Sequence, residues 1–199
     1  MAGLLRITGG ALGGRHLRVP PGEGVRPTQD RVREALFNAL QPIIGGCAFL
    51  DLFAGSGAVG LEALSRGAGR ACWVEQERRV FATLKDNVEL LLGNAATADC
   101  RCQDVFAFCR GWRGDRGFDI IFADPPYALR GAGAGLAGRL LEQLLAGGRQ
   151  HPLVAPGALL VLEQGAREPA PEAAGWTLVR EREYGRTCLR TYREKEVAA

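Results

Sequence analysis

Strand-like and helix-like segments alternate along most of this chain, and this alternation limits its possible folds more than any other feature. The apolar runs that predict strands are Cys47–Phe53, Ala71–Glu75, Phe118–Ala123 and Ala158–Glu163, with Asp99–Gln103 as a shorter one. Helical segments lie between these strands. The first ends near Arg66, and the others span residues 77–92, 105–110 and 136–145. Strands that alternate with helices form a mostly parallel sheet with helices on both faces. We therefore expect an α/β fold.

Both ends of the chain depart from this alternation. Two short extended runs, Leu4–Thr8 and His16–Val19, flank a group of glycines and predict a β-hairpin. A helix should follow, with Thr28 as its N-cap. At the other end, Pro156–Gly157 predicts a turn, and Trp176–Glu183 with Thr187–Arg193 predicts an antiparallel hairpin.

Composition excludes several classes of protein. The chain has 199 residues, of which 47% are hydrophobic and 24% charged, as in an ordinary globular domain rather than a disordered chain. No apolar run approaches the roughly 18 residues of a membrane helix. Residues near the N-terminus form no apolar run of the kind a secretory signal needs, so we expect no such signal. We therefore expect a cytoplasmic, monomeric protein with reduced thiols. Cys100-x-Cys102 lacks the spacing of a zinc site, so no metal is expected.

Basic residues gather near both ends of the chain, although the net charge is only +3. Residues 1–33 hold six arginines against two acidic residues, and residues 178–196 hold five arginines and one lysine against four glutamates. A basic arm and a basic tail on a nearly neutral body suggest a polyanionic partner, although a solvated basic surface would look the same.

A glycine-rich loop follows the first long strand and has the sequence Gly55-Ser56-Gly57-Ala58-Val59-Gly60. This G-x-G-x-x-G pattern, with Glu75 at the end of the next strand, is compatible with a dinucleotide. Asp51 argues against that ligand, because a carboxylate just before the glycines would repel a pyrophosphate. S-adenosylmethionine carries an ammonium and a sulfonium instead, so the pattern favours it. Glu75 would then bind the ribose hydroxyls and Asp104 would lie near the adenine.

The segment Asp124-Pro125-Pro126-Tyr127 directly follows the Phe118–Ala123 strand. Ligands of such sheets bind beyond the carboxyl ends of the strands. An exocyclic amine of a nucleobase is a poor nucleophile, and two acceptors that hold its N–H groups can orient its nitrogen. The Asp124 carboxylate and the Pro125 carbonyl are suited to this task, the prolines stiffen the loop, and Tyr127 offers a face for base stacking.

Together these segments resemble the RsmD family of bacterial 16S ribosomal RNA guanine-N2 methyltransferases. The match covers Arg6–Pro21, Arg26–Asn38, Asp51–Ala68, Ala123–Tyr127 and the ending Tyr184-Gly185-Arg186-Thr187. The resemblance implies a Rossmann-like class I S-adenosylmethionine-dependent methyltransferase, with a mostly parallel seven-stranded sheet, a C-terminal antiparallel hairpin and a small N-terminal hairpin and helix. Residues 1–40 would form an RNA-contacting extension, and residues 41–199 the methyltransferase domain.

The resemblance also implies roles for individual residues in methyl transfer to a guanine N2 of 16S rRNA in the small ribosomal subunit. The expected catalytic residues are Asp124, Pro125, Pro126 and Tyr127. The expected cofactor-binding residues are Asp51, Phe53, Ala54, Gly55, Ser56, Gly57, Glu75, Gln76, Asp104, Val105 and Asp124. The expected RNA-binding residues are Arg6, Arg15, Arg18, Arg26, Thr28 and Arg33.

Other functions remain open from the residues alone. A DNA adenine-N6 methyltransferase uses similar chemistry but would need a target-recognition insertion, for which these segments are too short. A protein-glutamine methyltransferase would leave the basic arm unexplained, and Asp51 disfavours an NAD-dependent oxidoreductase. An RNA-binding ribosome assembly factor is the alternative without catalysis.

Overall fold

The structure, a computed structural model, describes residues 5–20, 27–93, 95–114, 116–125, 134–146 and 152–195. The chain divides into two compact units, Met1–Gln103 and Asp104–Ala199, here called unit 1 and unit 2. Among the described residues, no helix is both long and apolar enough to cross a membrane.

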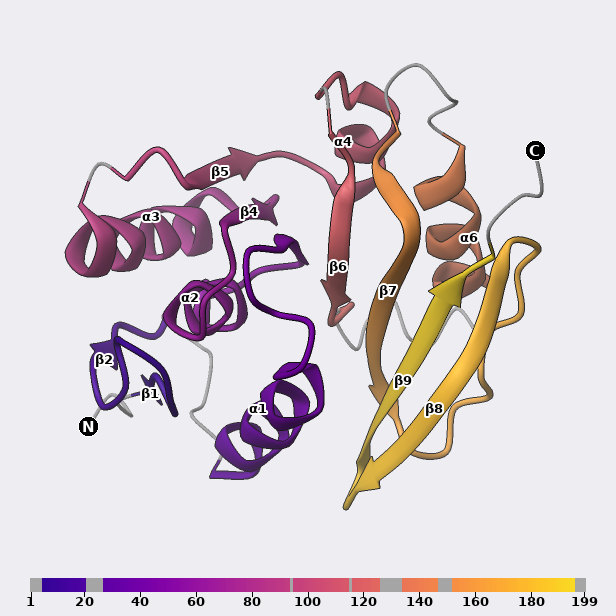
Figure 1. The fold of residues 1–199 in the computed structure, drawn as a ribbon, viewed down its shortest axis with the longest axis horizontal. Helices are drawn as coiled ribbons and strands as arrows, with labels where there is room; N and C mark the ends of the chain where they lie inside the picture. The colour runs from indigo at the N-terminus through magenta and orange to yellow at the C-terminus, as the bar shows by residue number, and fades with distance from the viewer. Residues whose placement is uncertain are drawn as a thin grey trace. The chain divides into compact units, whose positions relative to one another are not determined.

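Unit 1 contains the predicted N-terminal hairpin and the first part of the α/β alternation (Figure 1). Its elements are β1 (Leu5–Arg6), β2 (His16–Leu17), α1 (Pro27–Leu40), β3 (Ala48–Leu52), α2 (Ala58–Ser65), β4 (Arg70–Glu75), α3 (Arg78–Leu92) and β5 (Ala98–Cys102). Strand β4 pairs in parallel with β3 on one side and β5 on the other. Strand β3 is buried along its whole length, as its apolar sequence predicts.

Unit 2 continues the alternation and ends in the predicted antiparallel hairpin (Figure 1). Its elements are α4 (Val105–Gly111), β6 (Phe118–Ala123), α6 (Ala134–Leu145), β7 (Val154–Gly165), β8 (Trp176–Tyr184) and β9 (Thr187–Glu194). Strand β7 pairs in parallel with β6 and antiparallel with β9, and β9 pairs with β8.

Two boundaries of strands or helices differ from those predicted from the sequence. Pro156–Gly157 is not a turn between elements but lies inside β7, where the register against β6 shifts and Gly157 has φ +69°. Such a bulge accommodates a proline, which has no N–H for the ladder. Helix α1 begins at Pro27 and includes Thr28, which is therefore not its N-cap. Proline suits the first helical position because no N–H is needed there.

The N-terminal hairpin packs on the end of α2 through its glycines. Ser65 Oγ donates to the Gly9 carbonyl at 2.6 Å, and the Ser65 carbonyl accepts from Ala11 N at 2.7 Å. Gly10 has φ +79°, and a Cβ atom there would lie 2.0 Å from the Ser65 carbonyl oxygen. Only glycine can therefore occupy this position without a shift of the backbone.

A buried carboxylate, Glu62 of α2, joins this hairpin to two helices. It is 0% exposed and accepts hydrogen bonds from Thr8 N and Thr8 Oγ1 in the hairpin. It also forms ion pairs with Arg33 of α1 and with Arg66 just after α2, both at 2.9 Å. Arg33 in turn donates to the Arg6 carbonyl and pairs with Asp30 at 3.0 Å. The hairpin and α1 are thus tied to α2 inside unit 1.

This network predicts a large loss of stability in Glu62→Gln, measured by urea unfolding. The amide is isosteric but neutral, so two nearly buried guanidinium groups lose their shared counter-charge. We expect the free energy of unfolding to fall by roughly 3–5 kcal/mol. The matched control is Asp86→Asn, which breaks the exposed Arg18–Asp86 pair and should cost less than about 1 kcal/mol. Equal effects of the two changes would contradict this account.

Candidate functional site

The glycine-rich loop of unit 1 runs from Phe53 to Gly57 between β3 and α2. Its backbone enters the left-handed region at Phe53 (φ 59°), Gly55 (φ 54°) and Gly57 (φ 81°). Glycine tolerates this conformation, whereas at Phe53 it costs about 1–2 kcal/mol. A strained non-glycine residue is typical of a binding loop whose shape is fixed by its surroundings. Ala54 N donates to the Val74 carbonyl at 3.1 Å, which fixes the loop to β4.

Asp51, at the carboxyl end of β3, directs its carboxylate to the start of α2. Its Oδ2 atom accepts a hydrogen bond from Gly60 N at 2.9 Å, and its side chain is buried. The N-cap residue of α2 is Gly57, which has no side chain to perform this function. Asp51 therefore places a negative charge at the helix N-terminus, the position where a dinucleotide-binding loop would hold a pyrophosphate.

The third glycine of the loop motif, Gly60, allows a neighbouring side chain to pack closely against α2. A Cβ atom at Gly60 would lie 2.3 Å from Trp73 Nε1, so the indole of β4 fits only against a glycine. Trp73 Nε1 donates to the Gly57 carbonyl at 3.1 Å. The sequence analysis did not single out Trp73, although a tryptophan in a buried strand beside a glycine-rich loop needs a partner for its N–H.

Glu75, which the sequence assigned to the ribose of the cofactor, lies at the end of β4 and reaches the glycine loop. Its Oε2 atom accepts from Gly55 N at 3.0 Å, and Oε1 accepts from Glu77 N at 2.8 Å. A carboxylate has about four acceptor positions, so capacity remains for hydroxyl groups of a ligand. Gln76, the next residue, is exposed.

Asn87 of α3 links the basic hairpin to the same loop, and the sequence analysis missed it. Its Oδ1 atom accepts from Arg18 N, and its Nδ2 atom donates to the carbonyls of Arg18 and Ser56, each at 2.9 Å. Asn87 is fully buried. An uncharged polar residue on the apolar face of a helix is the signal that could have identified it.

The residues of unit 2 that the sequence assigned to the site lie at element ends. Asp104 is the exposed N-cap of α4, and its Oδ1 atom accepts from Ala107 N at 2.8 Å, while Val105 is buried. Asp124 is the first residue beyond β6 and is half-buried, and Pro125 is buried. Pro126 and Tyr127 lie outside the described residues, so their roles stay predictions.

The predicted RNA-binding residues divide into exposed and buried ones. Arg6, Arg15 and Arg18 are exposed on the hairpin, where Arg6 lies 3.9 Å from Asp30 and Arg18 lies 2.9 Å from Asp86. Arg33 is only 6% exposed and belongs to the Glu62 network, so its placement does not support contact with RNA. Arg26 and the side chain of Thr28 lie outside what the structure describes.

Cys100 and Cys109 are poor candidates for reactive thiolates. Burial and the nearby Asp99 raise the pKa of Cys100 to about 11, and burial with Asp104 raises the pKa of Cys109 to about 12. Both thiols therefore stay protonated at neutral pH. The described part of the chain contains no cluster of three or more His, Cys, Asp or Glu side chains that could hold a metal ion.

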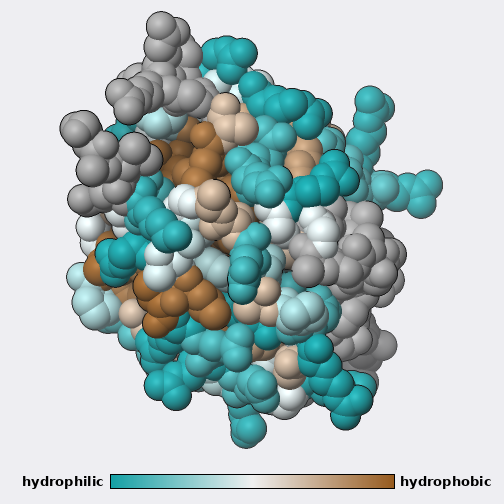
Figure 2. Space-filling model, turned by 90° about the vertical axis from the view of Figure 1, so that its right-hand side faces the viewer, coloured by the Kyte–Doolittle hydropathy of each residue, from teal (hydrophilic) through white to brown (hydrophobic). Residues whose placement is uncertain are grey.

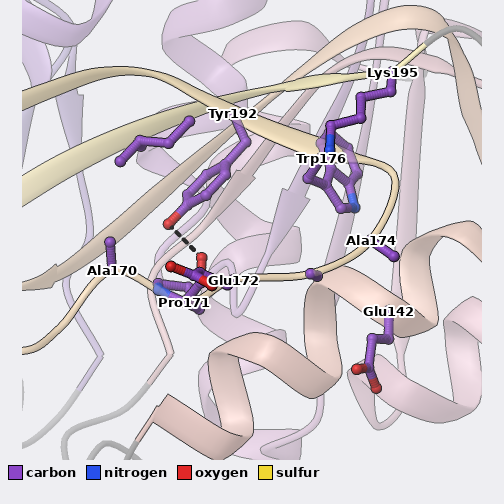
Figure 3. A pocket seen from close by; sticks show the side chains of 10 residues that line it. Glu142, Ala170, Pro171, Glu172, Ala174, Trp176, Tyr192 and Lys195 are labelled. Atoms are coloured by element: carbon purple, nitrogen blue, oxygen red, sulfur yellow. Dashed lines mark hydrogen bonds between the residues drawn. The ribbon is translucent and has the colours of Figure 1, made fainter.

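A cavity of about 540 Å³ lies in unit 2 (Figure 3). Trp176 and Tyr192 form its wall, with Glu142, Glu172 and Lys195 around it. The Tyr192 hydroxyl donates to the Pro171 carbonyl at 3.1 Å, and burial raises the pKa of Tyr192 to about 12. The tyrosine is thus a neutral packing residue, and none of the predicted catalytic or cofactor-binding residues lines this cavity.

Comparison with known proteins matches this chain to relatives along nearly its whole length. It is 38% identical over 196 residues to ribosomal RNA small subunit methyltransferase D of Escherichia coli K12, covering 98% of this chain and 92% of that protein. The protein of the same name from Haemophilus influenzae is 35% identical over 190 residues, covering 96% and 94%.

Solved structures agree with these sequence matches. A proposed methyltransferase from Escherichia coli, yhhF, superposes with a TM-score of 0.82 at 36% identity, over 98% of this chain and all of that one. A hypothetical protein from Thermus thermophilus gives 0.73 at 35% identity, over 97% and 99%. These likenesses confirm the predicted Rossmann-like methyltransferase fold. The model of the family described as Conserved hypothetical protein 95 matches residues 5–193, and the chain therefore belongs to this family, the RsmD family that its motifs predicted.

Proposed function

We propose that this protein transfers a methyl group from S-adenosylmethionine to the exocyclic N2 of a guanine in 16S rRNA. The observation that carries the choice of cofactor is the hydrogen bond from Gly60 N to Asp51 Oδ2 at the start of α2. The negative charge of Asp51 opposes a phosphate at this position and favours a cationic ligand. The relatives named as rRNA methyltransferases support the reaction and the substrate class.

Unit 1 carries most of the residues that would hold the cofactor, and Asp104, Val105 and Asp124 of unit 2 would complete the set. The sulfonium of S-adenosylmethionine supplies an electrophilic methyl group. Asp51 would attract the positive charges of the methionyl part, and the loop Phe53–Gly57 would allow its close approach. Glu75 is already held against Gly55, and its remaining lone pairs would accept hydrogen bonds from the ribose hydroxyls.

Unit 2 carries the residues that would hold the target amine. Asp124 and Pro125 directly follow β6, so their acceptors stand at the carboxyl end of a buried strand. The Asp124 carboxylate and the Pro125 carbonyl would each accept one N–H of the guanine amine and so orient its nitrogen. The amine loses one proton when its bond to the methyl carbon forms, and Asp124 or water would accept that proton.

Motifs and charge distribution in the sequence support further proposals about the location of the enzyme, its oligomeric state and its RNA contacts. We place the target in the small ribosomal subunit and the enzyme in the bacterial cytoplasm, acting as a monomer without a metal. The exposed Arg6, Arg15 and Arg18 would contact phosphates, because cationic side chains on a hairpin provide affinity without reading sequence.

The role of Asp51 predicts the outcome of Asp51→Asn, measured by titration calorimetry with S-adenosylmethionine. Asparagine keeps an acceptor for Gly60 N but removes the charge, so the Kd should rise about 10- to 100-fold, or roughly 1.4–2.8 kcal/mol. NADH should bind neither protein. Asp86→Asn, which neutralises an exposed acid of the same unit, should leave the Kd unchanged. An unaltered Kd in Asp51→Asn would remove the electrostatic argument for this cofactor.

The role of Asp124 predicts the outcome of a transfer assay with methyl-labelled S-adenosylmethionine. Wild-type protein should label undermethylated small subunits or free 16S rRNA, and not duplex DNA. Asp124→Ala should lower kcat about 10²–10⁴-fold, since it removes one of the two acceptors that orient the amine. The cofactor Kd should change much less, because the other cofactor-binding residues are kept.

The matched control for that assay is Asp119→Ala, which removes a carboxylate from β6, the strand that Asp124 follows. Asp119 pairs with Arg116 and lies before the carboxyl end of the strand, so its loss should leave kcat within about twofold. Label in DNA would favour adenine as the target instead. Undiminished RNA labelling by Asp124→Ala would exclude Asp124 as the residue that holds the amine.

A further inference from the structure

The C-terminal hairpin β8–β9 separates its charges by face. Strand β8 contains the run Arg180-Glu181-Arg182-Glu183, and successive side chains of a strand point to opposite faces. The register pairs Arg180 with Thr191 and Arg182 with Leu189, so both arginines share a face with those residues. Glu181 and Glu183 lie on the other face. We call the side with Arg180 and Arg182 the arginine face.

On the other face of the hairpin, Glu181 is held within unit 2, while Glu183 is exposed. Arg190 of β9 is 3% exposed and binds Glu181, the Gln164 side chain at 2.9 Å and the Glu168 carbonyl at 2.7 Å. These bonds join β8 and β9 to the end of β7 and the segment after it. The hairpin is therefore anchored, and an anchored surface loses less entropy when it binds a partner.

On the arginine face, the two arginines of β8 are open to solvent, whereas Leu189 beside them on β9 is buried. Arg180 and Arg182 are exposed, and within the described part of the chain their side chains make no ion pair or hydrogen bond. Glu163 of β7 shares this side of the sheet and is half-buried. Figure 2, which views the molecule from the right of Figure 1, where β8 lies, shows many hydrophilic side chains around smaller hydrophobic patches, and Leu178 and Val179 of β8 are exposed as well.

The turn of the hairpin lies at the functional end of unit 2. Tyr184 pairs with Thr187 across the two-residue turn Gly185–Arg186, and Thr187 pairs with Gly165 at the carboxyl end of β7. Ala166 N donates to the Arg186 carbonyl at 3.0 Å. Since β6 and β7 are parallel, this is also the end at which Asp124 leaves β6, as Figure 1 shows.

The strand order within unit 2 sets the distance of the arginine face from Asp124. Strand β8 lies three strand spacings from β6, or roughly 14 Å at about 4.8 Å each. An RNA segment with one base at Asp124 could span this distance. Exposed arginines suit phosphates because the guanidinium is planar, always charged and able to form two parallel hydrogen bonds.

We infer that the arginine face, with Arg186 of the turn, binds the phosphate backbone of RNA beside the target nucleotide. The inference rests on the proposed function for the identity of the RNA. It assigns a role to the Tyr184-Gly185-Arg186-Thr187 segment, which the sequence resemblance included but the proposed chemistry does not use. It gives unit 2 its own RNA contact, separate from the hairpin of unit 1.

The test compares two double variants that remove equal charge from unit 2. Arg180→Gln/Arg182→Gln neutralises the arginine face, and Arg110→Gln/Arg139→Gln neutralises two exposed arginines of α4 and α6. Binding to a 16S rRNA fragment is measured by fluorescence anisotropy between 50 and roughly 200 mM salt. We expect the first variant to bind about tenfold more weakly, and its plot of log K against log salt to flatten by about 1.4, as expected for two lost contacts with single-stranded RNA. The control should change both values little.

Steady-state methyl transfer gives a second readout. The KM for rRNA should rise about tenfold in the arginine-face variant, while kcat at saturating RNA and the cofactor Kd stay within about twofold. Binding and KM equal to those of the control variant would overturn the inference. The inference would also fail if the arginine-face variant differed from the control only in associating with itself. The arginines would then serve to keep an edge strand from pairing with another molecule. If wild-type protein binds this RNA but methylates none, the proposed function fails, and the binding comparison still tests the face.

Discussion

The buried carboxylate of Glu62 is the interaction on which the arrangement of unit 1 depends. It receives donors from the N-terminal hairpin, from α1 and from the residue after α2, and the hairpin and α1 lie far from it in the sequence. A buried charge is costly unless every partner is in place, so this network specifies one arrangement more than it adds stability. It fixes the hairpin to α2, the helix whose N-terminus carries the glycine loop.

A second set of polar contacts connects this framework to the chemistry. Asp51 occupies the N-terminus of α2, Glu75 holds Gly55, and Asn87 joins Ser56 to the end of the hairpin. Three side chains from three different elements thus hold the cofactor loop and the start of α2. The side chain of Asn87 also bonds the backbone of Arg18. The same residue therefore positions both the cofactor loop and the end of the arginine-bearing hairpin.

The spacing of apolar residues, together with turn and cap residues, predicted most of the helices and strands. This works because strands and helices bury their apolar faces with different spacings. The sequence failed where the meaning of a residue depends on distant partners. Pro156–Gly157 has the local chemistry of a turn, and only its pairing with β6 makes it a bulge within β7. Arg33 was assigned to RNA through the family resemblance, yet it lies on the buried side of α1. Glu62 could have revealed this, since it is the one charged residue in the otherwise apolar helix α2. Asn87 carried a similar signal on α3.

The central claim is the identity of the methylated atom, and nucleoside analysis tests it most directly. Undermethylated small subunits would be incubated with the protein and isotopically labelled S-adenosylmethionine, and their rRNA digested to nucleosides for mass spectrometry. The account predicts that the label appears in N2-methylguanosine at one site of 16S rRNA. Label in N6-methyladenosine, in another guanine position or in ribosomal protein would contradict it.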